Sequence, residues 1–187
     1  TLAYSALNNI AARNSSPATI LNKLSAYLRE SFEIHQLYGQ VINDGMDMAV
    51  CCLDRKRMEL SYAGARNPLV LVRGGEVIEL KADRRSISGR SDDGAVSVYA
   101  DQKIKLEKGD SLYIFTDGFA DQFGGPEGKK FKFSRLKEKL VEIAGLPSYR
   151  QRKALLDTFS AWRGELEQID DVLAHPHIGV RDAGPGD

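Results

Sequence analysis

The residues best suited to chemistry are two groups of aspartates, each at one end of a strand-like run. Thr116-Asp117-Gly118 directly follows the apolar run SLYIF, and Asp170-Asp171 stands at the start of the last such run, DDVLAHPHIGVR. A carboxylate at the end of a buried strand is held firmly, and a glycine beside it lets the backbone approach whatever the carboxylate binds. This arrangement suits a hard cation.

The identity of that cation follows from the ligand atoms. If the two strands are neighbours, Asp117 and Asp170 can share one metal centre. Oxygen ligands, with neither cysteine nor a well-placed histidine beside them, indicate Mg²⁺ or Mn²⁺ rather than zinc. A plainer interpretation also stays open, because Asp-Gly is a common turn dipeptide and aspartates before a strand often cap or solvate a loop.

Two helices are expected ahead of the strands. The segment from Leu2 to Ala12 has helical composition, and Pro17 opens a second helix after a short run of Asn and Ser. Apolar residues recur in the second helix at helical spacing and form one face that should pack on a sheet. These residues are Ile20, Leu21, Leu24, Leu28 and Phe32.

From Met46 onward the sequence predicts antiparallel strands. MDMAVCCLD, MELSYAG, PLVLVR and EVIELK are short runs separated by DRKR, GARN and GG, which predicts a meander, and VSVYADQKIKL and SLYIF continue the sheet. Two more helices, FSRLKEKLVEIA and about Tyr149 to Leu166, precede the last run, in which Pro176 fits only an edge strand or a bulge. Grouped strands with helices around them indicate an α+β fold.

The composition favours a single soluble globular domain. Of 187 residues, 42% are hydrophobic, and 26 Lys and Arg balance 26 Asp and Glu, which disfavours a nucleic-acid partner. The apolar runs are far shorter than the roughly 18 to 20 residues of a membrane span. Cys51 and Cys52 should lie on opposite faces of a strand as buried or half-buried thiols, which suggests a reducing compartment.

The order of motifs resembles the SpoIIE-like (RsbU-like) bacterial serine/threonine phosphatases of the PPM, or type 2C, family. AGARNP, then TDG after SLYIF, then a closing DD follow one another as the AGxxNP-type, TDG and DD motifs do there. The resemblance covers residues 1–181 as a partial phosphatase domain and leaves 182–187 as a flexible tail. It implies a PPM-type sandwich of two antiparallel β-sheets flanked by α-helices.

The resemblance also implies the site and its reaction. Asp117 and Asp170 would be ligands of a two-metal Mn²⁺ or Mg²⁺ centre, with Gly118 as the tight-turn partner of Asp117. Asp121 would support the metal through a water or cap the helix after the turn, and Asp171 would lie close by. A metal-activated water, rather than a side-chain nucleophile, would hydrolyse phosphoserine or phosphothreonine on a partner protein.

Two departures from the family pattern carry expectations of their own. The family's opening strands, with the aspartate that bridges the metals and a Gly-His-Gly turn, have no counterpart, so we expect this segment to be impaired alone. The sheet edges thus exposed should pair with a second copy.

Arg66 stands where many relatives have histidine, and it could either reach a phosphate or remain solvated. Lys129 or Lys130 in GGPEGKK, interpreted as a surface flap, could guide a phosphoprotein.

Relatives act in bacterial partner-switching, where they dephosphorylate STAS-domain anti-sigma-factor antagonists. The resemblance therefore implies a phosphoprotein substrate, an upstream sensor domain, and a cytoplasmic location, free or as the cytoplasmic C-terminal domain of a membrane-anchored sensor. The alternative is a catalytically inactive module of the same fold that binds a regulatory partner. In that case Asp117 and Asp170 would be dispensable.

Overall fold

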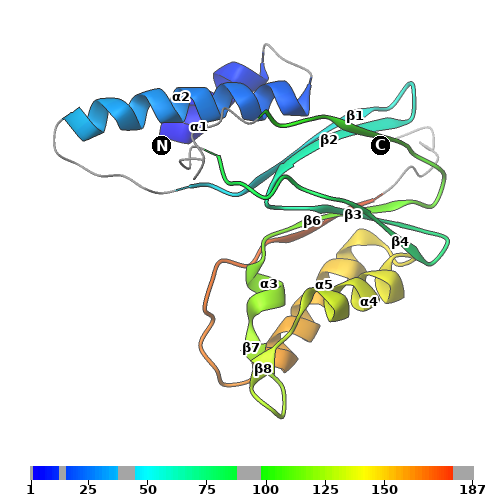
Figure 1. The fold of residues 1–187 in the computed structure, drawn as a ribbon. Helices are drawn as coiled ribbons and strands as arrows, with labels where there is room; N and C mark the ends of the chain where they lie inside the picture. Colours follow the sequence, from blue (N-terminus) through cyan, green and yellow to red (C-terminus); the bar gives the residue numbers. More distant parts are fainter. Residues whose placement is uncertain (1, 13–15, 38–44, 88–97, 179–187) are drawn as a thin grey trace. The chain divides into compact units, whose positions relative to one another are not determined.

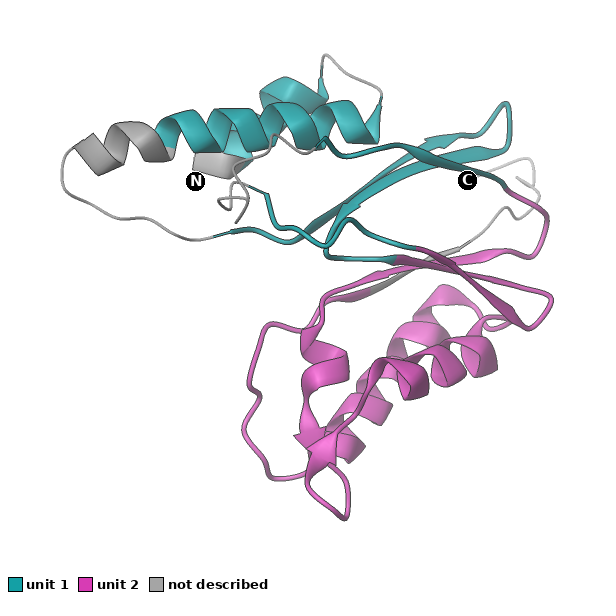
Figure 2. Cartoon of the chain, in the orientation of Figure 1, with its two compact units in different colours: residues 1–68, 81–105 teal, residues 69–80, 106–187 magenta. Residues whose placement is uncertain are grey.

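The computed structural model describes residues 2–12, 16–37, 45–87 and 98–178 (Figure 1). The chain falls into two compact units, residues 1–68 with 81–105 and residues 69–80 with 106–187 (Figure 2). Each unit combines antiparallel strands with helices, so the predicted α+β class is confirmed. The predicted tail, 182–187, lies outside the described residues. Within the described ranges, no helix has the length and apolar character needed to cross a bilayer.

The first unit is a three-stranded antiparallel sheet covered by two helices. Its strand order is β1 (Met48–Asp54), β2 (Glu59–Ala65), β5 (Gln102–Lys105), and its helices are α1 (Leu2–Ala11) and α2 (Pro17–Leu37). The α2 helix contacts β1 and β2. Leu21 and Leu24 of its predicted apolar face are fully buried there, which confirms that this face packs on a sheet.

The two cysteines lie next to each other on β1, at an edge of this sheet. Cys51 is paired with Tyr62 of β2, and Cys52 with Ser61. Both thiols are free and half-buried, as predicted. Burial, together with the neighbouring Cys52, raises the pKa of Cys51 to about 12. Because the thiolate is the reactive form of cysteine, this raised pKa disfavours reaction of Cys51 near neutral pH.

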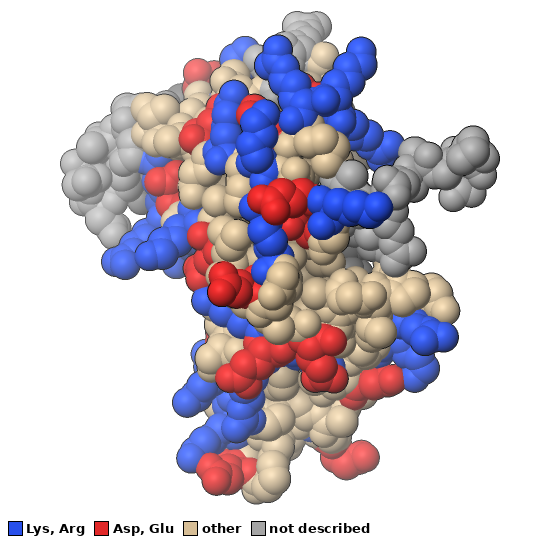
Figure 3. Space-filling model, turned by 90° about the vertical axis from the view of Figure 1, so that its right-hand side faces the viewer, with Lys and Arg blue, Asp and Glu red and all other residues tan. Residues whose placement is uncertain are grey.

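Charged side chains of both signs are mixed on the surface. On the face drawn in Figure 3, Lys and Arg lie among Asp and Glu and do not form one continuous basic region. This mixture agrees with the equal numbers of basic and acidic residues in the sequence.

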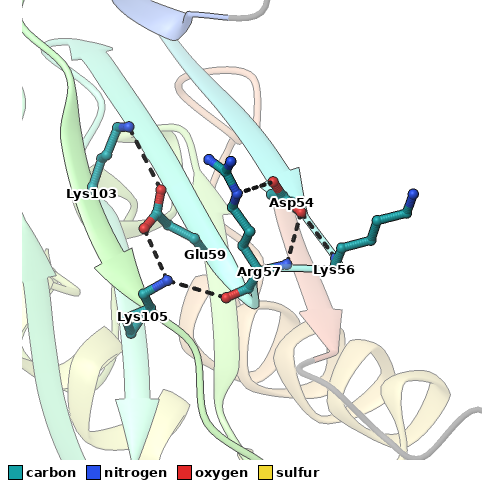
Figure 4. A network of polar contacts seen from close by, with 6 residues as sticks. All are labelled: Asp54, Lys56, Arg57, Glu59, Lys103 and Lys105. Carbon is teal, nitrogen blue, oxygen red and sulfur yellow. Dashed lines mark hydrogen bonds and ion pairs between the residues drawn. The ribbon is translucent and has the colours of Figure 1, made fainter.

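One end of the first sheet carries a network of such charges, drawn in Figure 4. The Asp54 carboxylate accepts the backbone N–H of Arg57 at 2.9 Å and so closes the β1–β2 turn. The Glu59 carboxylate lies 3.2 Å from the Lys105 ammonium and 3.6 Å from that of Lys103. The hydrogen bond from Lys105, aided by both positive charges, lowers the pKa of Glu59. Exposed ion pairs of this kind contribute little to stability.

The second unit is a four-stranded antiparallel sheet packed against two helices. The strand order is β4 (Glu76–Leu80), β3 (Leu69–Arg73), β6 (Ser111–Phe115), β9 (Ala174–Ile178), and the helices are α4 (Phe133–Ile143) and α5 (Ser148–Arg163). Residues of β3 and β6 share a core with the helices, and Leu155 and Phe159 of α5 are buried in it. Among the described strands β9 pairs only with β6, so Pro176 lies on an edge strand, as predicted.

The predicted meander is wrong at the step from its second to its third strand, while its other two hairpins, β1–β2 and β3–β4, are confirmed. β2 pairs with β1 and β5, whereas β3 pairs with β4 and β6. The turn after β2 is closed by the Tyr62 hydroxyl, which donates to the carbonyl of Asn67 at 2.6 Å. Gly64 is required there because a Cβ on it would fall 2.6 Å from that same carbonyl oxygen. Pro68, which has no N–H, cannot donate to a ladder with β2.

The predicted strand VSVYADQKIKL is shorter than expected. Only Gln102–Lys105 forms β5, and residues 98–101 lie outside any strand. A side chain of α2 bonds the backbone of one of these residues instead: Asn22 accepts the N–H of Tyr99 at 2.9 Å and donates to its carbonyl at 3.1 Å. In turn, the Asp101 carboxylate accepts the N–H of Ala18 in the first turn of α2 at 2.8 Å.

A buried ion pair stabilises the second unit. The Arg73 guanidinium donates to both carboxylate oxygens of Asp110, at 2.8 and 2.7 Å, and the Asp110 side chain is fully buried. Replacing Asp110 with alanine leaves this half-buried guanidinium without its main partner and is expected to cost about 2 to 3 kcal/mol of unfolding free energy in urea titrations. Glu107→Ala, which removes the exposed partner of the same arginine, serves as control. Equal losses in the two variants would contradict this assignment.

Candidate metal centre

The two groups of aspartates lie at the same edge of the second sheet. β6 and β9 are antiparallel neighbours, with Phe115 opposite Ala174. The C-terminal end of β6 therefore meets the N-terminal end of β9, with Asp117 just after the first and Asp170 just before the second. The two strands are therefore neighbours, which is the condition under which Asp117 and Asp170 could share one metal centre. The strand itself begins at Ala174, later than predicted, and just before it one side chain bonds the carbonyl of Asp171 and the N–H of Leu173.

That side chain is Thr116, the residue before Asp117. Its hydroxyl donates to the carbonyl of Asp171 at 2.8 Å and accepts the N–H of Leu173 at 2.9 Å. Its backbone N–H donates to the carbonyl of Leu173 at 2.9 Å. Thr116 had been assigned no role from the sequence, although a hydroxyl at a strand end beside an acid could have indicated one. It fixes the backbone beside Asp170 relative to the backbone of Asp117.

Gly118 brings the two groups into direct contact. A Cβ on Gly118 would fall 2.5 Å from the carbonyl oxygen of Asp171 and 3.3 Å from the Cβ of Asp170. Only a residue without a side chain allows this approach. The Asp117, Asp170 and Asp171 side chains are exposed, and the Asp171 N–H donates to Oδ1 of Asp170 at 2.7 Å.

A short helix, α3 (Gly118–Asp121), fixes Asp117 from the other side. The Asp117 carboxylate makes no capping hydrogen bond to this helix, so it is not used as a cap. So short a helix has little stability of its own and depends on tertiary packing. Phe119, 1% exposed, supplies that packing, with ring centroids 5.2 Å from both Phe131 and Phe159.

Asp121, at the end of α3, faces a small hairpin. Its carboxylate lies 3.0 Å from the ammonium of Lys130, which belongs to β8 (Lys129–Lys130). β8 pairs with β7 (Phe123–Gly124), and the turn between them is largely exposed. The predicted flap is thus a two-stranded hairpin that Asp121 contacts through an ion pair.

The segment that carries Asp170 connects α5 to β9, and we call residues 164–173 the acid segment. α5 ends at Arg163, before the predicted Leu166, because Gly164 adopts a positive φ of 56° and its N–H donates to the carbonyl of Ser160 at 3.0 Å. The side chains of residues 165–171 are exposed, whereas their backbone is held by hydrogen bonds within the second unit. The acid segment is therefore an ordered connection and not part of a helix or strand.

These residues offer part of a coordination sphere for a hard cation. Carboxylate oxygens on a fixed backbone suit Mg²⁺ or Mn²⁺ chemically, and the glycine contact lets both acids occupy one edge. In the part of the chain that the structure describes, however, no three His, Cys, Asp or Glu side chains gather into a metal-binding group. Arg66 belongs to the first unit, where it is exposed at the turn after β2.

The chain is similar to known proteins over most of its length. The profile of a family described as Stage II sporulation protein E (SpoIIE) matches residues 1–174. The SiaA-PP2C domain of Pseudomonas aeruginosa is 32% identical, with a TM-score of 0.81 over 94% of this chain. The chain spans 66% of the length of that domain. Among curated protein sequences, none matches the chain significantly.

Two more distant structures share the fold. The phosphatase domain of the cell fate determinant SpoIIE from Bacillus subtilis (Mn presoaked) is 14% identical, with a TM-score of 0.61 over 98% of this chain and 76% of that one. The RsbU and RsbW domains of a Mycobacterium tuberculosis protein are 19% identical, with a TM-score of 0.63 over 96% of this chain and 47% of that one. These similarities confirm the predicted PP2C-type α+β fold.

Proposed function

The chain belongs to the SpoIIE family of PP2C-type phosphatase domains, and from this premise we propose that it is part of a metal-dependent protein serine/threonine phosphatase. The substrate class would be phosphoserine or phosphothreonine on a partner protein. The observation that carries the proposal is the sheet edge where Thr116 and Gly118 hold Asp117 beside Asp170. Residues 1–181 would form this chain's share of the domain, and 182–187 its tail.

Asp117 and Asp170 would hold Mn²⁺ or Mg²⁺, and further ligands would have to come from outside the described residues. When bound, the metal supplies Lewis-acid chemistry, lowering the pKa of water and neutralising charge on the phosphoryl oxygens. The protein's own contribution is to fix the two carboxylates. Thr116 fixes the backbone on one side, and the buried ring of Phe119 anchors the helix on the other.

Lys130 gives the site a means of attracting a phosphoprotein. Its ammonium is about half exposed and stands beside Asp121, at the base of the hairpin that follows α3. A cation beside Asp121, four residues after Asp117, would favour approach of a phosphate dianion while leaving the metal to bind it. Asp121, in this proposal, orients Lys130 rather than binding metal directly.

The cellular role would be bacterial signalling of the partner-switching type. The RsbU and RsbW domains of the similar structure occur together in it. This supports the proposal that a regulatory partner exists here. We propose a phosphorylated STAS-domain antagonist as substrate, an upstream sensor domain and a cytoplasmic location. Self-association of this chain through sheet edges belongs to the same proposal, and light scattering of the purified chain measures it directly.

The test is Mn²⁺-dependent hydrolysis of p-nitrophenyl phosphate by this chain and by the complete product of its gene, each with and without Asp117→Asn. We expect hydrolysis by the complete gene product that EDTA abolishes and Mn²⁺ restores, and that the substitution removes. Asp157→Asn, an exposed acid of α5 paired with Lys153, is the control and should leave the activity intact.

Hydrolysis that persists in Asp117→Asn would contradict the assignment of Asp117 as a metal ligand. Absence of hydrolysis in every form, with binding of a phosphorylated partner retained, would instead favour the inactive binding module. The inactive module would be recognised by its binding of the partner, which neither Asp117→Asn nor EDTA would change.

A further inference from the structure

Gln122 is a fully buried polar residue next to the candidate metal centre. It directly follows α3, and its side chain is 0% exposed. Its amide Nε2 donates to the carbonyl of Glu167 at 2.9 Å and to that of Phe123 at 3.0 Å. Burying an amide is costly unless it is hydrogen-bonded, so the contact with Glu167 is a specific link between the end of α3 and the acid segment.

Gln122 and Thr116 hold the acid segment at two points on either side of Asp170. The Thr116 hydroxyl holds the carbonyl of Asp171, one residue after it, and the Gln122 amide holds the carbonyl of Glu167, three residues before it. In sequence the two donors bracket Asp117 and α3. Both side chains that hold the backbone around Asp170 therefore belong to one short segment, residues 116–122, which also carries Asp117.

Gln122 is itself held rigidly, as a positioning residue must be. Its backbone carbonyl accepts the indole N–H of Trp162 at 3.0 Å and the N–H of Phe131 at 2.9 Å. The Trp162 ring packs edge-on against Phe131, with centroids 5.3 Å apart. The Trp162 carbonyl in turn accepts the N–H of Gly125 at 2.8 Å. The amide of Gln122 therefore acts from a fixed point.

We propose that Gln122 is a positioning residue of the metal centre, which sets where Asp170 stands relative to Asp117 by holding the Glu167 carbonyl. This inference rests on the proposed function. Groups that orient metal ligands without touching the metal typically change its affinity by about 10- to 100-fold when removed. If Gln122 only satisfied a buried carbonyl, its removal would lower the stability of the fold and leave the affinity for Mn²⁺ unaltered.

The chain offers a matched control in Gln151, the other fully buried glutamine of the same unit. It is 1% exposed, and its Nε2 also donates to two carbonyls, of Ala144 at 3.1 Å and Leu146 at 2.8 Å. Its Oε1 accepts the hydroxyl of Tyr113 at 2.9 Å. Gln151→Met thus removes the same kind of hydrogen bonds without touching the acid segment.

The experiment measures Mn²⁺ binding to the complete product of the gene by electron paramagnetic resonance, in the wild type and in Gln122→Met, Gln151→Met and Asp117→Asn. We expect Gln122→Met to weaken Mn²⁺ binding by about tenfold or more and Gln151→Met to leave it within about twofold. Without metal, hydrogen exchange of residues 165–173 should accelerate in Gln122→Met and stay unchanged in Gln151→Met.

Each outcome decides the matter. Wild-type affinity in Gln122→Met, or equal weakening by both glutamine variants, overturns the inference while the loss in Asp117→Asn upholds the proposed function. Wild-type protein that binds no Mn²⁺, or Asp117→Asn that binds like wild type, overturns the proposed function and the inference with it. If Gln122→Met does not fold, Gln122→Asn, which keeps a buried amide too short to reach Glu167, is read in its place by the same criteria.

Discussion

Replacing Asp170 with asparagine is expected to weaken Mn²⁺ binding by more than about 100-fold, the upper end for residues that merely support a ligand. Mn²⁺-dependent phosphatase activity should fall at least as far. Asparagine keeps the shape of the side chain and can still accept the N–H of Asp171, so the local backbone is preserved. What is lost is the negative charge beside Gly118, where we place the metal.

The neighbouring acid gives this experiment its control. Thr116 holds the backbone carbonyl of Asp171, not its carboxylate, so Asp171→Asn leaves that contact intact. We expect Asp171→Asn to retain most of the Mn²⁺ affinity and activity. Isothermal titration with Mn²⁺ and p-nitrophenyl phosphate hydrolysis are measured on both variants. An equal loss in both, or a greater loss at Asp171, would show that the second acid of the pair is the ligand.

The two strand ends that carry the acids could be predicted from the sequence for a definite reason, although the pairing of those strands could not. Asp117 ends one strand-like run and Asp170 precedes another, and a run of apolar residues specifies a strand without reference to the rest of the chain. Antiparallel neighbours then bring the end of one strand to the start of the other. The apolar face of α5, with Leu155, Phe159 and Trp162, is likewise a local pattern at helical spacing, and it packs in the core.

The features that the sequence did not predict all depend on single contacts between distant segments. Thr116 bonds a carbonyl 55 residues away, and Gln122 bonds one 45 residues away. Backbone carbonyls carry no side-chain signature, so no periodicity records such partners. The same limit explains the wrong meander, because the choice of β6 instead of β2 as the neighbour of β3 is made by pairing across the chain.

Packing around α3 joins these local and distant features. Phe119 lies one residue after Gly118 and packs on Phe131 and Phe159, which reach it from the hairpin exit and from α5. The helix that follows Asp117 is thus fixed by the core, and the acid segment is fixed by hydrogen bonds from the residues on either side of that helix and its N-cap, Thr116 and Gln122. The metal centre we propose is as rigid as the core beneath it, which is what a preorganised site requires.

Gly118→Ala is expected to disrupt this centre without removing any ligand. The added methyl group would fall 2.5 Å from the carbonyl oxygen of Asp171 and 3.3 Å from the Cβ of Asp170, so the acid segment must move. A displacement of about 1 Å in a catalytic site can cost about 100-fold in rate, and we expect a loss of that order in Mn²⁺-dependent hydrolysis. Mn²⁺ affinity should fall with it.

Gly145→Ala is the matched control, because a Cβ there meets nothing within 4 Å and no positive φ is required. It should leave activity unchanged and stability equal or slightly higher, since alanine restricts the unfolded chain. Hydrolysis, Mn²⁺ titration and thermal unfolding are measured on both variants. If Gly118→Ala keeps wild-type activity and Mn²⁺ affinity, the close contact between the two strand ends does not determine the metal centre, and the ligands must be sought elsewhere in the chain.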